Sequence, residues 1–222
     1  MNFVLWLNSL DELLYELMSW LVFFPITLWR IVRHPLATMR YAEEQLLLER
    51  KRQYRETVSP PIMLILTVVA VDGLGIAIDG ANPIVTSKRG LAGLVDDNTT
   101  LLLLRLVLFG LFALVLASRK VNRSAEPLNR DTLKPPFYAQ CYAISPFAIL
   151  VSGGTSMVSH HQLPLQVAGV GAIAAALLFY GVVEIRWLSR ELSQSLPRSF
   201  LDASIGMVTS IVLTIGLGLL FH

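Results

Sequence analysis

The sequence predicts an all-α protein: a polytopic membrane helical bundle of five transmembrane helices, preceded by amphipathic, interfacial N-terminal helices. Hydrophobic residues make up 54% of the 222 residues and charged residues only 15%, whereas soluble domains carry roughly 25% charged residues. The mean hydropathy of +0.60 is typical of an integral membrane protein. Long apolar segments alternate with short segments that carry most of the charge, which is the pattern of a membrane bundle.

Residues 1–57 are predicted to form amphipathic and charged helices on the cytoplasmic side. In the first thirty residues, leucines lie opposite polar side chains that recur three or four apart: Asn8, Asp11, Glu12, Tyr15 and Ser19. Such a helix suits the lipid headgroup layer, although packing on the protein's own surface would give the same pattern. Because no Lys or Arg precedes Arg30, we expect no signal peptide here.

Residues 36–57 read as a charged helix along the inner membrane face. Its basic end, ERKRQYR, either attracts anionic lipids or only sets the topology. Nucleic acid is not an expected partner, because no basic domain with interleaved aromatic residues accompanies this patch.

Residues 58–222 are predicted to be one transmembrane domain with five spans. Each apolar segment has about 20 residues, enough to cross roughly 30 Å of hydrocarbon at 1.5 Å per residue. The spans are 60–80, 99–118, 137–158, 165–186 and 202–221.

The basic residues predict the orientation of these spans. Fifteen of the 18 Lys and Arg residues fall on one side, and only Lys88 and Arg89 fall on the other, while Arg105 lies within a span. Cytoplasmic segments carry the excess of Lys and Arg. We therefore expect a cytoplasmic N-terminus and an external C-terminus.

Two charged residues fall inside apolar segments. Asp72 interrupts the first span and Arg105 the second, and antiparallel neighbours would bring them to similar depth. A carboxylate buried without a partner is costly, and a nearby guanidinium favours its charged form. We expect an intramembrane ion pair, which either clamps two helices or forms part of a proton or ion relay. Glu184, at the inner end of the fourth span, is expected at the interface, within reach of water.

Proline and glycine predict a helix break in the third span. Pro146 lacks a backbone donor, and the pair Gly153 and Gly154 loosens a helix, so we expect a kink or break there. Transporters use broken helices to expose backbone groups to a substrate, but such residues are also common in membrane helices without that role.

Small residues form a stripe on each of the last two spans. They recur every four residues and let helices approach closely. We expect the two stripes to pack against each other or against another subunit. Their members are Ala168, Ala172 and Ala176 on the fourth span, and Gly206, Ser210, Thr214 and Gly218 on the fifth.

The sequence contains no recognisable enzyme motif. It has one cysteine, Cys141, which excludes an internal disulfide and a multi-cysteine metal site. His160 and His161 are expected to be exposed loop residues, since no carboxylate or cysteine lies near them in the sequence. No phosphate-binding glycine loop, nucleophile elbow or HExxH motif is present. We expect no catalytic residue, no metal and no cofactor.

Two short segments resemble a known family. FFPITLWRIVRHP at 23–35 precedes the spans, and FYAQCYAISPFAIL at 137–150 opens the third with a Tyr-Ala-x-x-Pro pattern. With the five-span, N-inside plan, they resemble the Yip1-like family of small integral membrane proteins. The resemblance links eukaryotic members to vesicle traffic and small GTPases. This chain lacks their long hydrophilic N-terminal tail, which favours a bacterial inner-membrane member.

The expected function is that of a non-enzymatic membrane scaffold, accessory subunit or membrane organiser. Its expected partners are the lipid bilayer, including anionic lipids, and other membrane subunits or further copies of itself. The alternative is a transporter or channel subunit that uses the Asp72–Arg105 region and the broken third span as its path.

Overall fold

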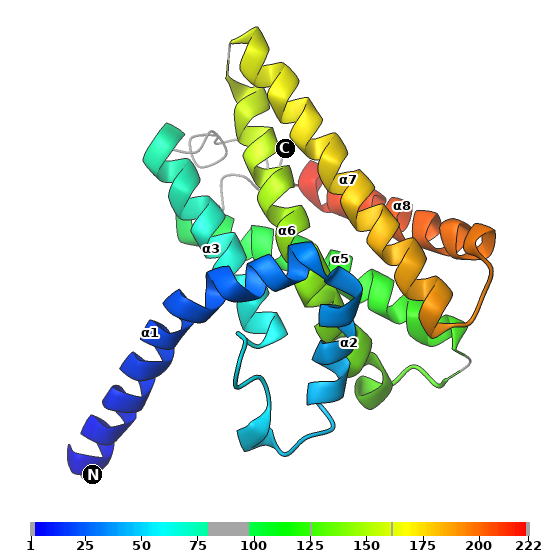
Figure 1. Cartoon of the computed structure of the whole chain (residues 1–222). Coiled ribbons are helices and arrows are strands. Elements are labelled where there is room, and N and C mark those ends of the chain that lie inside the picture. The colour runs from blue at the N-terminus through cyan, green and yellow to red at the C-terminus, as the bar shows by residue number, and fades with distance from the viewer. Residues whose placement is uncertain (1–2, 80–97, 125, 161, 221–222) are drawn as a thin grey trace.

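The computed structural model describes residues 3–79, 98–124, 126–160 and 162–220, with side chains described over 11–76 and 99–217 apart from residues 125 and 161. This part of the chain is helical without any strand, as predicted (Figure 1). Within the described residues, seven α-helices and one short 3-10 helix follow one another. They are α1 (Phe3–Arg33), α2 (Pro35–Gln45), η1 (Arg50–Arg52), α3 (Pro60–Asp79), α5 (Asn98–Arg123), α6 (Arg130–Ser159), α7 (Leu163–Glu191) and α8 (Leu196–Leu220).

Local sequence signals explain where several helices begin. Prolines stand at the first positions of α2, α3 and α7, where a missing N–H costs nothing and the fixed φ suits a helix. The start of α6 is a capping box: Asn129 accepts hydrogen bonds from the backbone N–H groups of Asp131 and Thr132, and the Thr132 hydroxyl accepts from the Asn129 N–H. This cap places the start of α6 seven residues before the predicted span.

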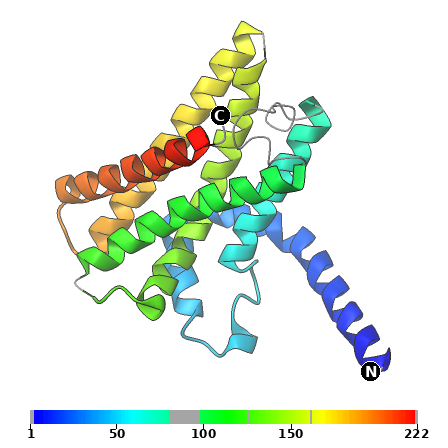
Figure 2. The ribbon, with the colours of Figure 1, turned by 180° about the vertical axis from the view of Figure 1, so that it is seen from behind.

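Helix α6 lies at the centre of the fold. It contacts α1, α2, α3, α5 and α7, and its middle turns are buried. Phe147 of α6 stacks on Phe112 of α5, with ring centroids 5.3 Å apart, and on Tyr180 of α7 at 5.1 Å. Seen from behind, α5 and α8 run across the bundle (Figure 2), and α8 contacts both α5 and α7.

Of the kink or break expected in α6, the break is wrong. The helix continues through Pro146, Gly153 and Gly154 from Arg130 to Ser159. A proline removes one backbone hydrogen bond, and the packing of α6 on its neighbours offsets a local cost of that kind. Gly154 has a packing role instead: a Cβ atom there would lie 2.8 Å from the backbone oxygen of Gly169 on α7.

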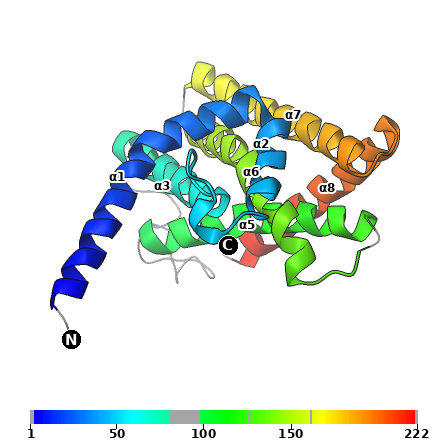
Figure 3. The same ribbon diagram turned by 60° about the horizontal axis from the view of Figure 1, so that its bottom comes forward.

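The N-terminal helix α1 packs on the bundle with its second half only. Its second half contributes Ile31 to a core cluster with Ala42, Met63 and Tyr142. Its first half extends away from the bundle (Figures 1 and 3). We call residues 11–22 the arm.

Five helices in the described part of the chain are long and apolar enough to cross a membrane. The sequence predicts the same number, but one of the five segments differs from the predicted set. The predicted first span matches α3, but only Pro60–Ile76 of it has described side chains, and that part is shorter than a full span. The segment Asp11–Arg33 of α1 qualifies in its place. The five are Asp11–Arg33, Thr99–Arg123, Arg130–Ser159, Leu163–Glu191 and Leu196–Leu217.

Candidate functional site: charged side chains between the helices

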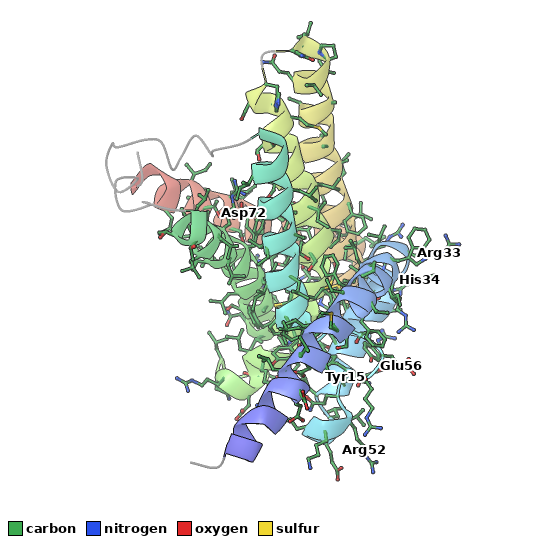
Figure 4. All side chains as sticks on the ribbon, turned by 90° about the vertical axis from the view of Figure 1, so that its left-hand side faces the viewer. Tyr15, Arg33, His34, Arg52, Glu56 and Asp72 are labelled. Carbon is green, nitrogen blue, oxygen red and sulfur yellow. The ribbon has the colours of Figure 1, made fainter. Side chains whose placement is uncertain are left out.

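The structure brings Asp72 and Arg105 together. Arg105 Nη1 donates a hydrogen bond to Asp72 Oδ1, which joins α3 to α5. The Asp72 side chain is 6% exposed and that of Arg105 is 25% exposed. Figure 4 shows Asp72 on α3 within the bundle. A carboxylate this buried needs a cationic partner to stay charged.

A second buried carboxylate lies near the start of α8. Asp202 Oδ1 accepts hydrogen bonds from Arg119 Nη2 at 2.8 Å, Arg123 Nη2 at 2.6 Å and Arg123 Nε at 2.9 Å. The Asp202 side chain is 2% exposed. The sequence does not predict this cluster, because both arginines lie beyond residue 118, where the predicted second span ends. The signal was their spacing of four residues, which puts both guanidinium groups on one face of a helix.

Lys120 joins three helices. Its Nζ lies 2.8 Å from Glu43 Oε1 on α2, 3.2 Å from Glu191 Oε2 on α7 and 4.4 Å from the centre of the Trp187 ring. Arg40 also pairs with Glu191, at 3.6 Å. Burial raises the pKa of the Glu43 carboxyl above its ordinary value of 4.5, and Lys120 offsets only part of that rise.

Glu184 lies inside the protein, so its expected contact with water is wrong. It is fully buried, and its Oε1 accepts a hydrogen bond from Gln140 Nε2 at 2.6 Å, while the Tyr180 hydroxyl donates to Gln140 Oε1 at 2.7 Å. Helix α7 continues to Glu191, so Glu184 lies about two turns inside its end. Neither Glu184 Oε2 nor the Trp187 ring N–H has a hydrogen-bond partner within the described structure.

The small-residue stripes are used only in part. Ala176 belongs to the main core cluster, and Gly206 and Ser210 are buried, whereas Ala168 is exposed and Ala172 and Thr214 are half-buried. Gly206 faces α5, where an added Cβ would lie 2.5 Å from Leu116 Cδ2. Helices α6 and α7 instead approach each other closely at Gly154 and Gly169. Gly218 lies outside the residues whose surroundings are described.

Two surface grooves are lined in part by arginine side chains. One, of about 420 Å³, lies between α5 and α8 and is lined partly by Arg119 and Arg123. The other, of about 560 Å³, lies between the bend that joins α1 to α2 and the C-terminal half of α7. Across the described residues, no three His, Cys, Asp or Glu side chains gather as they would around a metal ion. His160 Nδ1 lies 3.0 Å from the Ser156 carbonyl oxygen, and His161 lies outside the described residues.

Comparison of the chain with protein-family models, curated proteins and solved structures found no match. The fold and its charge pairs define a class, a polytopic helical protein with five helices able to span a membrane. What the chain can do chemically follows from the contacts described above. They hold buried charges in a pair and in two small clusters between helices. Among the described residues, they leave Glu184 Oε2 and the Trp187 ring N–H without a hydrogen-bond partner.

Proposed function

We propose that this chain is a non-enzymatic integral membrane protein that acts as a scaffold, accessory subunit or membrane organiser, and that its arm makes the contact. The exposure of the arm carries the proposal. Leu14 is 56% exposed and Leu21 is 72% exposed, and Leu13, Leu17, Met18 and Val22 are exposed as well. A contiguous exposed apolar surface of this kind marks a protein–protein or membrane contact.

In this proposal α3 is the first span, and the arm lies along the cytoplasmic face although Asp11–Arg33 is long and apolar enough to cross a membrane. Tyr15 lies toward the same end of the molecule as Arg52 and Glu56, and Asp72 lies nearer the opposite end (Figure 4). The positive-inside rule assigns the basic end to the cytoplasm. We propose a bacterial inner-membrane protein of the Yip1-like kind, with its N-terminus inside and its C-terminus outside.

A pair of matched double variants tests the role of the arm. Leu14→Glu with Leu21→Glu adds two charges to its apolar face, and Tyr15→Glu with Ser19→Glu adds two to its polar face. The measurement is affinity purification of the full-length protein in nanodiscs, with identification and quantitation of what co-purifies. We expect the first variant to lose its co-purifying subunits, or its self-association, at unchanged abundance. Retention of the same partners by both variants would refute the proposal.

Transport is the second candidate, and the buried Glu184 favours it. Ionisable residues within a membrane bundle commonly mark proton or ion pathways, and one oxygen of this carboxylate has no hydrogen-bond partner among the described residues. The path would use Glu184 and the Asp72–Arg105 pair, without a broken third span. In proteoliposomes with a pH-sensitive dye and a potassium gradient, Glu184→Gln and Asp72→Asn should abolish flux at unchanged abundance. Wild-type protein that carries no flux would exclude this candidate.

A further inference from the structure

The larger groove is formed by two segments far apart in the sequence. One wall is the bend between α1 and α2, from His34 to Ala37, and the other is α7 from Leu178 to Arg190. The bend lies beside α7 in both Figure 1 and Figure 3. The groove has a volume of about 560 Å³.

The α7 wall changes from apolar to basic along its length. Leu178, Val182, Arg186 and Arg190 are spaced four residues apart, so they form one stripe on the helix. Leu178 is 69% exposed and Val182 is 45% exposed. From Leu178 to Arg190 the stripe is about 18 Å long at 1.5 Å per residue.

Among the described residues, the basic half of the stripe has no ion-pair partner. Both arginines are exposed, and neither side chain forms an ion pair or hydrogen bond with any other described residue. This contrasts with Arg119 and Arg123, which share Asp202. The lining of the groove contains His34 beside the arginines and contains no Asp or Glu. The groove therefore offers two unneutralised guanidinium groups next to an apolar channel.

An amphiphile with an anionic head matches both halves of this surface. Guanidinium groups bind phosphate through charge-assisted hydrogen bonds, and basic pockets on the cytoplasmic side of membrane helices bind anionic lipid head groups. The apolar half belongs to a helix long and apolar enough to span a membrane, so lipid acyl chains would surround it. An acidic peptide would match only the basic half.

We infer that this groove binds one anionic glycerophospholipid. Its phosphate contacts Arg186 and Arg190, and an acyl chain lies along Leu178, Phe179 and Val182. The site does not depend on the scaffold role of the arm, because the groove and the arm use different residues.

Native mass spectrometry of the full-length protein in detergent tests the site. The probes are phosphatidylglycerol and phosphatidylcholine with identical acyl chains, titrated against the wild type and three variants. Arg186→Gln with Arg190→Gln removes the charges. Ala37→Phe narrows the groove from an exposed position without changing charge. Arg198→Gln is the control, since Arg198 is an exposed arginine outside the groove.

We expect phosphatidylglycerol to bind the wild type more tightly than phosphatidylcholine. The double variant should lower phosphatidylglycerol affinity about 25-fold, at about fivefold for each arginine near a membrane surface. Ala37→Phe should lower the affinity for both lipids, and Arg198→Gln should leave both affinities unchanged. Glycerol 3-phosphate at millimolar concentration should not displace the bound lipid.

Four results of the lipid titrations would overturn the inference, and a fifth concerns the oligomeric state. The first is equal affinity of the wild type for the two lipids, and the second is a loss of phosphatidylglycerol affinity in Arg198→Gln equal to that in the double variant. The third is unchanged lipid affinity in Ala37→Phe, and the fourth is displacement of the lipid by glycerol 3-phosphate. The fourth would identify the groove as a site for a free phosphate compound. A protein dimer that dissociates in the double variant, with no lipid bound to the wild type, would assign the groove to a second copy of the chain.

Discussion

Replacing Asp202 by Asn should destabilise the fold more than replacing an exposed charged residue does. The change keeps the side-chain shape and removes the charge that neutralises Arg119 and Arg123. Breaking a buried ion pair costs about 3–5 kcal/mol, but exposed pairs contribute only about 0–1 kcal/mol. The Asp202 side chain is 2% exposed, whereas those of Arg119 and Arg123 are 21% and 41% exposed. Water therefore stabilises part of the freed charge, and we expect a loss of about 2–3 kcal/mol in the free energy of unfolding.

The assay is thermal unfolding of the full-length protein in detergent, followed by fluorescence-detected size exclusion. For a chain of this length, 1 kcal/mol corresponds to about 2–4 °C, so Asp202→Asn should lower Tm by about 4–12 °C. The control is Glu56→Gln, since the Glu56 side chain is 77% exposed and pairs with Arg30 at 3.8 Å. The control should shift Tm by at most about 4 °C. Equal shifts for the two variants would refute the reasoning, because burial would then make no difference.

Three further changes test other contacts. Gly154→Leu should push α6 away from α7 and lower the free energy of unfolding by about 1–3 kcal/mol. Gly153→Leu should be nearly neutral, because an added Cβ there meets no described atom within 4 Å. Chemical denaturation of the two variants measures the difference. Tyr142→Phe removes the hydroxyl that donates to the Val58 carbonyl at 2.6 Å, and should cost about 1–3 kcal/mol by the same measurement. Because burial holds the pKa of Glu43 above 4.5, the folded state binds that proton more tightly than the unfolded state, so this carboxyl lowers stability as pH rises from 4.5 through its raised pKa. Glu43→Gln should remove that part of the pH dependence of Tm; an identical profile in the variant would contradict this.

The apolar pattern predicts the helices and misplaces their ends. The predicted span 60–80 matches α3 at its start, Pro60, and as far as Asp79, the last residue described before residue 98. Helix α5 instead runs to Arg123, five residues past the predicted 118. The hydropathy signal ends at the edge of the hydrocarbon, whereas a helix continues until a cap or a turn stops it.

The same difference explains which charge contacts the sequence could predict. Asp72 and Arg105 interrupt apolar runs at matching depth, so their pairing followed from the topology. The Lys120 and Asp202 clusters depend on helix ends that extend beyond the apolar runs and on how α2 and α8 pack, which a single sequence does not encode locally. The prediction of a break at Pro146 was wrong for a related reason. The sequence shows the local effect of a proline, but it does not show the packing of α6 that offsets this effect.

The Asp72–Arg105 pair also constrains how the chain can enter a bilayer. A charged residue at the centre of a helix that inserts by itself costs about 2.5–3.5 kcal/mol. Because α3 carries the acid and α5 the base, each helix would bear that cost if it moved into lipid separately. Moving together as a hairpin, the two helices enter with their charges already neutralised. Translocation machinery that releases helices one at a time would therefore have to hold α3 until α5 has been synthesised.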